Sequence, residues 1–412
     1  MQLIDRFAEL VVRVGVNIQP GQDVHISGLV EHAPIARAVA EQAYRAGARR
    51  VVVAYDDLYV RRAAIDHAPE EALGTAYAYE RERIREWGER GTALITLTGN
   101  PDPSILAGAD PRRGAAMSSR ELSTLFRSIT EDGHVPWTVV AAPNAGWARQ
   151  VFGEPDVDRL WAAVSTAMRL DEPDPVGSWR ERLETLRARD IAITSLGADA
   201  VRFRGPGTDL TIGLIPGGRW TSGAMTTPSG IAFIPNLPTE EVFTSPDWRR
   251  AEGTIRATAP LVLPQAGVLV KGLRFRFEGG RIVEAEADEG VDAVRAQLAR
   301  DPQAPFLGEV SMVDGSSRVR RAGVVFHDTL FDENAGCHIA YGGAFPTVLP
   351  GGLSMTPAER LAAGLNDCTL HTDVVVGGPE VSVDAILADG TTIPVIAGDA
   401  WVLPVEDRAA GR

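Results

Sequence analysis

The sequence predicts an α/β protein in which an N-terminal, doubly wound and mostly parallel sheet domain is followed by a strand-rich α+β domain. The length of 412 residues exceeds the roughly 250 to 300 at which one hydrophobic core stops growing, so two domains are expected. Up to about residue 185, apolar strands alternate with amphipathic helices, which is typical of a parallel sheet with helical crossovers. Beyond that point short strands and turns prevail, which indicates a second type of domain.

The first domain is predicted from strand and helix segments that follow one another at the spacing of βαβ units. The helix expected at residues 34–46 has one apolar face and is followed by Gly47, a stop signal. In chain order the expected elements are strand 22–27, helix 34–46, strand 50–55, helix 79–89, strand 93–98, strand 135–142 and helix 156–170.

A linker is expected at residues 171–175, where the sequence Asp-Glu-Pro-Asp-Pro interrupts the pattern. It divides the chain into a Rossmann-like α/β domain, residues 1–185, and a second domain, residues 186–412. A connecting helix is expected around residues 179–189. The strands expected in the second domain include residues 209–213, residues 268–277, and a hairpin of residues 381–387 and 392–396 around Asp389-Gly390.

The composition argues against several classes of function. The net charge of −14 disfavours binding to duplex nucleic acid, which requires a basic surface to neutralise phosphates. The chain has a single lysine, Lys271, and no Gly-Lys-Ser/Thr phosphate loop, so P-loop and most lysine-dependent chemistries are disfavoured. The turn after the first strand, residues 28–33, lacks the second and third glycines of a dinucleotide site.

A cytoplasmic location without a membrane partner is expected. No segment reaches the roughly 20 consecutive apolar residues that span a bilayer. The first residues place Asp5 where a signal peptide has a basic region and then a long apolar run, which disfavours export. The two cysteines, Cys337 and Cys368, are too few for a disulfide framework and are typical of a reducing compartment.

Residue types that bind metal ions gather in the second half of the sequence. Three of the seven histidines, His327, His338 and His371, lie between residues 327 and 371. Asp373 follows His371 by two positions, and such residues project from the same face of an extended chain, so that both can reach one ion. The alternative interpretation is a solvated aspartate and a hydrogen-bonded histidine at a strand end.

Glutamates flanked by apolar residues add to this pattern. Glu240 and Glu241 lie in a proline-bounded segment, and Glu309 lies in the string Leu-Gly-Glu-Val. Burial of a carboxylate is costly unless a cation or hydrogen-bond donors receive it. An exposed position on a strand is the commoner outcome for such a residue.

Four strings in this half resemble the metal-binding blocks of the aminopeptidase T and aminopeptidase S family of dinuclear metallopeptidases. They are PNLPTEEVFTSP (235–246), LGEV (307–310), LFDENAGCHIAYG (330–342) and HTDVVVG (371–377), in the family's order and with similar spacing. The likeness extends to residues 15–22 and 205–210 and so covers nearly the whole chain. The resemblance implies six metal ligands: Glu241, Glu309, Glu333, His338, His371 and Asp373. Glu240 is less favoured than its neighbour, because adjacent residues of an extended segment point to opposite sides.

The charges of these six residues are consistent with two divalent ions. The four carboxylates contribute −4 and the ions +4, so the site can hold a bridging hydroxide without a large uncompensated buried charge. A set of oxygen and nitrogen ligands suits zinc, cobalt or manganese. The resemblance then implies a metal-dependent aminopeptidase, which hydrolyses N-terminal amide bonds of peptides through a water shared by the two ions.

One position departs from the family pattern. The family commonly carries a tyrosine seven residues after the histidine of the third block, where this chain has Phe345. Tyr341 carries the nearest hydroxyl in sequence. The candidate catalytic residues are Glu309 and Tyr341. If no hydroxyl replaces the missing one, the alternative is a dinuclear amidase that acts on a narrower small-molecule amide.

Two further functions remain open from the sequence. A remote relative of the family is similar to mononuclear-iron enzymes that open hydroxypyridine rings with dioxygen, and His338, His371 and Asp373 would supply that triad. The three glutamates of the ligand set argue against this, because a single iron would leave them uncompensated. A non-catalytic binding protein is disfavoured by the complete ligand set. The expected partners are a peptide or small amide substrate and, since similar proteins are dimers, a second copy of the chain.

Overall fold

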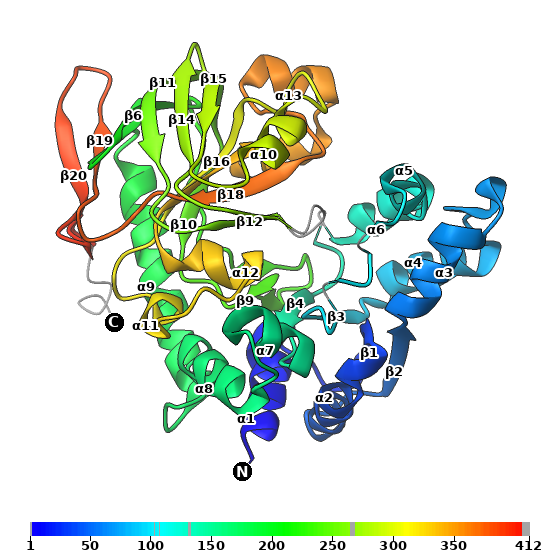
Figure 1. The fold of residues 1–412 in the computed structure, drawn as a ribbon. Coiled ribbons are helices and arrows are strands. Elements are labelled where there is room, and N and C mark those ends of the chain that lie inside the picture. Colours follow the sequence, from blue (N-terminus) through cyan, green and yellow to red (C-terminus); the bar gives the residue numbers. More distant parts are fainter. Residues whose placement is uncertain (1, 103, 107, 131–132, 264–267, 406–412) are drawn as a thin grey trace. The chain divides into compact units, whose positions relative to one another are not determined.

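The computed structural model describes the chain apart from residues 1, 103, 107, 131–132, 264–267 and 406–412. The chain divides into two compact units (Figure 1). The first unit comprises Met1–Arg180 and Ala224–Thr239, and the second comprises Glu181–Gly223 and Glu240–Arg412. None of the helices formed by the described residues has the length and apolar character needed to cross a lipid bilayer.

A five-stranded parallel sheet organises the first unit, with the strand order β2-β1-β3-β4-β9. The strand β3 reads ALITLT and is buried along most of its length, as expected for a strand of a parallel sheet covered on both faces. The prediction of a mostly parallel sheet is therefore confirmed. The first four strands are β1 (Asp23–Leu29), β2 (Arg50–Asp56), β3 (Ala93–Thr98) and β4 (Trp137–Ala141).

The helices of this unit begin and end at residues suited to capping. The carboxylate of Asp156 accepts a hydrogen bond from the Arg159 N–H at the start of α8, and Gly91 ends α4 in the left-handed conformation. The helix α9 (Pro175–Ser195) begins within the expected linker, continues into the second unit, and is longer than the sequence predicts. The others are α1 (Leu3–Leu10), α2 (Ala33–Arg45), α3 (Leu58–His67), α4 (Ala78–Arg90), α5 (Pro111–Ala116), α6 (Arg120–Thr130), α7 (Ala145–Phe152) and α8 (Val157–Ala167).

The fifth strand of the parallel sheet comes from a later part of the chain. β9 (Asn236–Leu237) pairs in parallel with β4. Before it, β7 (Met225–Thr226) and β8 (Ala232–Phe233) form a small antiparallel pair. The segment Ala224–Thr239 therefore belongs to the first unit although it follows the linker in sequence.

Two antiparallel sheets make up most of the second unit (Figure 1). The larger has the order β15-β14-β11-β6-β5-β19-β20-β21, and the smaller has the order β10-β16-β17-β18. The larger sheet consists of β5 (Ala200–Gly205), β6 (Thr208–Leu214), β11 (Pro246–Arg256), β14 (Arg274–Glu278), β15 (Arg281–Glu286), β19 (Ser382–Ile386), β20 (Thr392–Ala397) and β21 (Ala400–Trp401). The smaller consists of β10 (Val242–Thr244), β16 (Leu307–Met312), β17 (His338–Gly342) and β18 (His371–Val375). The helices are α10 (Val291–Leu298), α11 (Arg318–Arg321), α12 (Thr329–Asp332) and α13 (Pro357–Ala363).

Most of the strands expected in this unit are present, and one differs. The expected hairpin is formed by β19 and β20, which pair antiparallel. The single strand expected over residues 268–277 is instead two strands, β13 (Val268–Val270) and β14. The chain turns between them at Gly272, whose φ of 63° lies in the left-handed region, and β13 pairs with β12 (Leu261–Leu263) outside the larger sheet.

A hydrophobic core is shared by the two sheets of the second unit. The larger sheet contributes Val201, Phe203 and Leu210, and the smaller contributes Val310 and Ile339, all buried to 1% exposure or less. Because side chains alternate along a strand, a face of the smaller sheet that packs into this core leaves the other face free for polar residues. That second face carries the candidate functional site.

Candidate metal centre

Polar side chains converge on the face of the smaller sheet opposite the core. Residues paired across neighbouring strands share a face. Ala340 of β17 lies opposite Glu309 on one side and opposite Asp373 on the other. His338, two residues before Ala340, lies opposite Ser311 of β16. Glu309, His338 and Asp373 therefore project from one face.

The outer strands β10 and β18 extend this face. His371 precedes Asp373 by two residues on β18 and lies opposite Gly342. Phe243 of β10 lies opposite Ser311, and Glu241 precedes Phe243 by two residues. The Ser311 hydroxyl donates a 2.7 Å hydrogen bond to Glu241 Oε2, which fixes that carboxylate over the same face.

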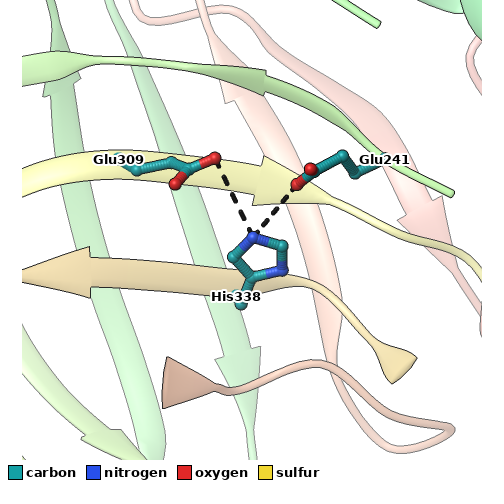
Figure 2. A group of neighbouring side chains, drawn as sticks. All are labelled: Glu241, Glu309 and His338. Atoms are coloured by element: carbon teal, nitrogen blue, oxygen red, sulfur yellow. Dashed lines mark ion pairs between the residues drawn. The ribbon is translucent and has the colours of Figure 1, made fainter. Parts of the chain in front are cut away.

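Short distances join these side chains into one cluster. His338 Nε2 lies 3.1 Å from Glu241 Oε2 and 3.9 Å from Glu309 Oε1 (Figure 2). His371 Nε2 lies 3.0 Å from Glu309 Oε2 and 3.3 Å from Asp373 Oδ1. Among the described residues, two trios have ligand atoms that all lie within 4.8 Å of one another, and Glu309 belongs to both: Glu241, Glu309 and His338, and Glu309, His371 and Asp373.

Glu333 reaches the cluster from a turn rather than from a strand. It opens the short 3₁₀ turn η4 (Glu333–Ala335), which follows α12 and precedes β17. Its carboxyl lies close enough to that of Asp373 for the two charges to interact. The amide of Asn334 lies 3.4 Å from Glu333 Oε1 and donates to it. The structure thus brings together all six residues named by the resemblance.

Both histidines are oriented by backbone carbonyls. His338 Nδ1 lies 3.2 Å from the Gly336 carbonyl, and His371 Nδ1 lies 2.8 Å from the Gly343 carbonyl. An Nδ1–H that donates to a carbonyl directs Nε2 toward the carboxylates, where a metal ion can take the place of the Nε2 proton. This arrangement is typical of histidines that ligate metal ions, because the second hydrogen bond fixes the ring and its tautomer.

Burial and neighbouring charges shift the pKa values of several residues of the cluster. Burial, followed by the charge of Asp373, raises the pKa of Glu333 well above its usual value, and burial also raises that of Glu309. Burial alone would lower the pKa of His338, but the hydrogen bond and charge of Glu241 raise it to about 10. The raised pKa values of Glu333, Glu309 and His338 all indicate that the cluster contains more negative charge than its own residues neutralise.

The donor set fits divalent cations. Four carboxylates and two imidazoles without a thiolate are the ligands that zinc, cobalt and manganese accept. Asp373 Oδ1 is buried and accepts no hydrogen bond, and its nearest cationic partner is His371 Nε2 at 3.3 Å. A buried carboxylate oxygen without a donor is costly, and a cation at that position would remove the cost.

Three other residues singled out in the sequence lie elsewhere. Glu240 is fully buried and forms an ion pair with Arg182 at 2.6 Å. It also accepts a hydrogen bond from a backbone N–H of α11. The two adjacent glutamates, Glu240 and Glu241, therefore point into different surroundings. The Tyr341 side chain points into the core, where its hydroxyl donates a 2.5 Å hydrogen bond to Gln297. This position argues against the expectation that Tyr341 serves as a catalytic residue. Phe345, in contrast, lies beside the cluster with its ring centroid 5.1 Å from that of His371.

Ser311 and Asn334 contact the clustered carboxylates without having been expected to do so from the sequence. The period of two would have placed Ser311 on the face of Glu309, but Asn334 gave no signal, since its contacts depend on a turn. Of the cysteines, Cys337 packs in the core, where burial raises the pKa of its thiol to about 12, and Cys368 belongs to neither ligand trio. His327 likewise lies outside both trios of the described residues.

Comparison with known proteins identifies close relatives over almost the entire length. The family model described as "Thermophilic metalloprotease (M29)" matches residues 1–401. Aminopeptidase T of Thermus aquaticus is 40% identical over 407 residues, which covers 97% of this chain and 98% of the relative. Aminopeptidase 2 of Geobacillus stearothermophilus is 34% identical over 404 residues, with 97% of each chain covered.

Solved structures agree with this assignment. Wild-type AmpT from Thermus thermophilus has a TM-score of 0.88 at 36% identity, covering 97% of this chain and 99% of that one. This match confirms the predicted α/β fold class. The 2,5-dihydroxypyridine dioxygenase of Pseudomonas putida KT2440 has a TM-score of 0.54 at 14% identity over 98% of this chain and 97% of that one, a likeness of fold alone. The resemblance predicted from the sequence is confirmed, and the chain belongs to the M29 family of metalloproteases.

Proposed function

We propose that this protein is a metal-dependent aminopeptidase, which hydrolyses the N-terminal amide bond of peptides. The observation that carries the proposal is the cluster of four carboxylates and two imidazoles on one face of the smaller sheet. Membership of a metalloprotease family implies a divalent metal ion. The relatives named aminopeptidase T and aminopeptidase 2 support cleavage at the N-terminus of the substrate.

The six clustered residues would hold two divalent ions, of zinc, cobalt or manganese. Glu309 would serve both ions, because its two oxygens face different histidines. Glu241 and His338 would complete one set of ligands. His371 and Asp373 would complete the other, with Glu333 beside Asp373.

The residues of the chain prepare this site for hydrolysis. Divalent ions bound there supply an acidified water and a polarised scissile carbonyl. Ser311 holds Glu241, and the carbonyls of Gly336 and Gly343 hold the two imidazoles. Glu309 is the proposed catalytic residue, because it is the carboxylate common to both trios. Burial of the carboxylates keeps the site poor in water, which strengthens every electrostatic interaction within it.

Metal analysis and hydrolysis of aminoacyl p-nitroanilides test this proposal together. Wild-type protein should contain about two divalent ions per chain, and Glu309→Gln or His338→Ala should lose metal and amide hydrolysis while circular dichroism stays native. Glu181→Gln and His67→Ala, at exposed positions, are the matched controls and should keep both properties. Full activity with two bound ions in either site variant would contradict the assignment.

The same metal analysis separates the alternatives that the sequence left open. One iron per chain would favour the ring-opening dioxygenase, and no bound metal would favour a binding protein. Two ions with hydrolysis of small amides but not of dipeptides would favour the narrower amidase. The three glutamates of the cluster argue for two ions, because one ion would leave most of their charge uncompensated.

We also propose the organisation and setting of the protein. Residues 186–412 would form the metal-binding catalytic domain, and residues 1–185 would carry no metal ligand. Among the described residues, every member of the two trios lies in residues 186–412, which supports this proposal. A cytoplasmic homodimer is proposed as well, and the two free cysteines are consistent with a reducing compartment. Light scattering coupled to gel filtration measures the oligomeric state.

A further inference from the structure

His371 marks an accessible side of the metal-ligand cluster. Its side chain is 28% exposed, whereas those of Glu241, Glu309, His338 and Asp373 are exposed by 9% or less. A substrate that reaches the cluster from solvent can therefore approach past the His371 ring. The residues around that ring are in a position to contact the substrate.

Two aromatic side chains stand at this side of the cluster. The Phe345 ring packs edge-on against His371 at 5.1 Å and against Phe243 at 5.2 Å between ring centroids. Phe243 projects from the ligand-bearing face of the sheet, as its pairing with Ser311 requires. Phe345 is 37% exposed, and a large apolar side chain left accessible beside a reactive cluster indicates a binding surface.

The position of Phe345 is fixed before any substrate binds. Its backbone N–H donates a 2.8 Å hydrogen bond to the hydroxyl of Ser245, which is 1% exposed. Pro346 follows directly and opens the short 3₁₀ turn Pro346–Val348, in which Val348 is buried. A ring held in this way loses little conformational entropy when a ligand covers it, which favours binding.

We propose that Phe345 and Phe243 form the apolar wall of the subsite for the side chain of the substrate's N-terminal residue. The inference rests on the proposed aminopeptidase function and names its substrate class: peptides that begin with an apolar residue. In such a peptide the side chain is attached to the carbon between the α-amino group and the scissile carbonyl. Both of these groups lie at the cluster during hydrolysis, so the side chain lies within a few bonds of it.

The chemistry of the wall determines its preference. An apolar side chain that covers the exposed part of the Phe345 ring removes apolar surface of both partners from water. A charged side chain at the same place would lose hydration without gaining a partner from either ring. The enzyme should therefore favour leucyl over alanyl substrates, and alanyl over glutamyl substrates.

The test compares kcat/KM of the metal-loaded full chain on leucine, alanine and glutamate p-nitroanilides. Phe345→Ala and Phe243→Ala should each lower the leucine-to-alanine ratio about fivefold, a part of the discrimination that a complete apolar pocket provides. Phe126→Ala is the matched control, because Phe126 is also 37% exposed but lies in the first unit, and it should leave the ratio unchanged. Phe345→Leu keeps an apolar wall and should retain most of the preference if the alanine variant folds poorly.

A binding measurement separates this inference from the proposed function. Calorimetric titration of metal-loaded protein with free L-leucine and L-alanine should show the same loss of preference in Phe345→Ala. Hydrolysis that persists with an unchanged ratio and an unchanged leucine affinity in both variants would overturn the inference and leave the function standing. If wild-type protein hydrolyses none of the substrates, the proposed function fails. The leucine titration alone then decides whether Phe345 and Phe243 bind an apolar side chain.

Discussion

At the scale of single residues, the family's tyrosine position holds a phenylalanine. Phe345 keeps an aromatic ring beside His371 but has no hydroxyl to donate to the oxyanion that forms during hydrolysis. Tyr341 does not replace it, because its hydroxyl is bound to Gln297 on the core side of the sheet. The chain therefore brings the six proposed ligands together, while one expected hydroxyl donor is missing.

Phe345→Tyr should raise kcat on simple aminoacyl substrates by at least about tenfold. One oxyanion donor typically contributes about 10² to 10³ in kcat, and a tyrosine introduced without further adjustment should give the lower part of that effect. Metal content should not change. Steady-state kinetics with metal analysis checks both, and Tyr341→Phe should leave kcat within about twofold. An unchanged kcat in Phe345→Tyr together with a greatly lowered kcat in Tyr341→Phe would show that the Tyr341 hydroxyl is the donor to the oxyanion.

A second residue-scale prediction concerns the stability of the first unit in mild acid. His25 is 7% exposed and packs against Trp87, and burial, followed by the charge of Arg83, lowers its pKa from 6.5 to about 4. Below pH 6.5 the unfolded chain binds a proton that the folded chain does not, so stability falls as the pH falls from about 6.5 to about 4. This residue alone should account for a loss of about 2 kcal/mol between pH 7 and pH 5.

Denaturant unfolding at the two pH values measures this effect. His25→Gln should lose about 2 kcal/mol less than wild type on acidification, whatever its stability at pH 7. His134→Gln, at an exposed position, is the control and should follow the wild type. Equal acid sensitivity of wild type and His25→Gln would contradict the assignment of this proton uptake to His25.

At the scale of elements, the turn η4 and the segment that precedes β10 are joined through one buried amide. Asn334 Oδ1 accepts a 2.6 Å hydrogen bond from the backbone N–H of Glu240, and Asn334 Nδ2 donates to the Leu330 carbonyl at 3.1 Å. The same residue lies between the turn that carries Glu333 and the segment that carries Glu241. It has no exposed surface, so no water can take its place without a rearrangement.

Asn334→Ala should weaken metal binding by about 10- to 100-fold, the effect expected when a residue that orients ligands is removed. The reason is that Glu241 and Glu333 would no longer be held in a common frame. Competition with a fluorescent zinc chelator measures the change, and Asn236→Ala, at an exposed position of β9, is the control. Retention of wild-type zinc affinity in Asn334→Ala would show that the strand pairing alone positions the ligands.

Much of the element structure could be predicted from the sequence, and the reasons for the exceptions are physical. Periodicity located strands such as β3, and the period of two explains why Glu241 and Glu240 face opposite surroundings. The break at Gly272 was missed because the apolar residues on both sides continue the pattern through the turn. The contacts of Asn334 depend on a turn and those of Phe243 on which segments become neighbours, and a single sequence contains no direct signal of either.

At the scale of the whole molecule, the metal-ligand cluster links stability to metal supply. Without cations, several buried carboxylates lie close together, and like charges at such distances destabilise the fold. Ions that bind the folded chain and not the unfolded one add stability according to their concentration relative to Kd. The protein should thus be measurably less stable when its metals are removed.

EDTA should abolish hydrolysis and lower the melting temperature, and added cobalt or zinc should restore both. At a free metal concentration of 100 Kd the stabilisation per site is about 2.7 kcal/mol. Calorimetry of metal-free and reconstituted protein measures it, and Glu309→Gln should show a smaller difference between the two states. Melting that is indifferent to EDTA in wild type, with activity also unaffected, would contradict a metal-dependent enzyme.

The strand β10 and its flanking residues have a consequence for how this family can change in evolution. Glu241 contacts His338, Phe243 contacts Phe345, and Ser245 anchors the Phe345 backbone. These three residues point to the same side because side chains alternate along an extended segment. The insertion or deletion of a single residue among them would move at least one of the three side chains to the opposite face. Point substitutions at Phe243 remain open to drift and selection, whereas the spacing from 241 to 245 can vary only in steps that preserve the pleat. In this chain a substitution at Phe243 should therefore alter substrate preference without disturbing Glu241, whereas a change in the length of this segment should disturb both.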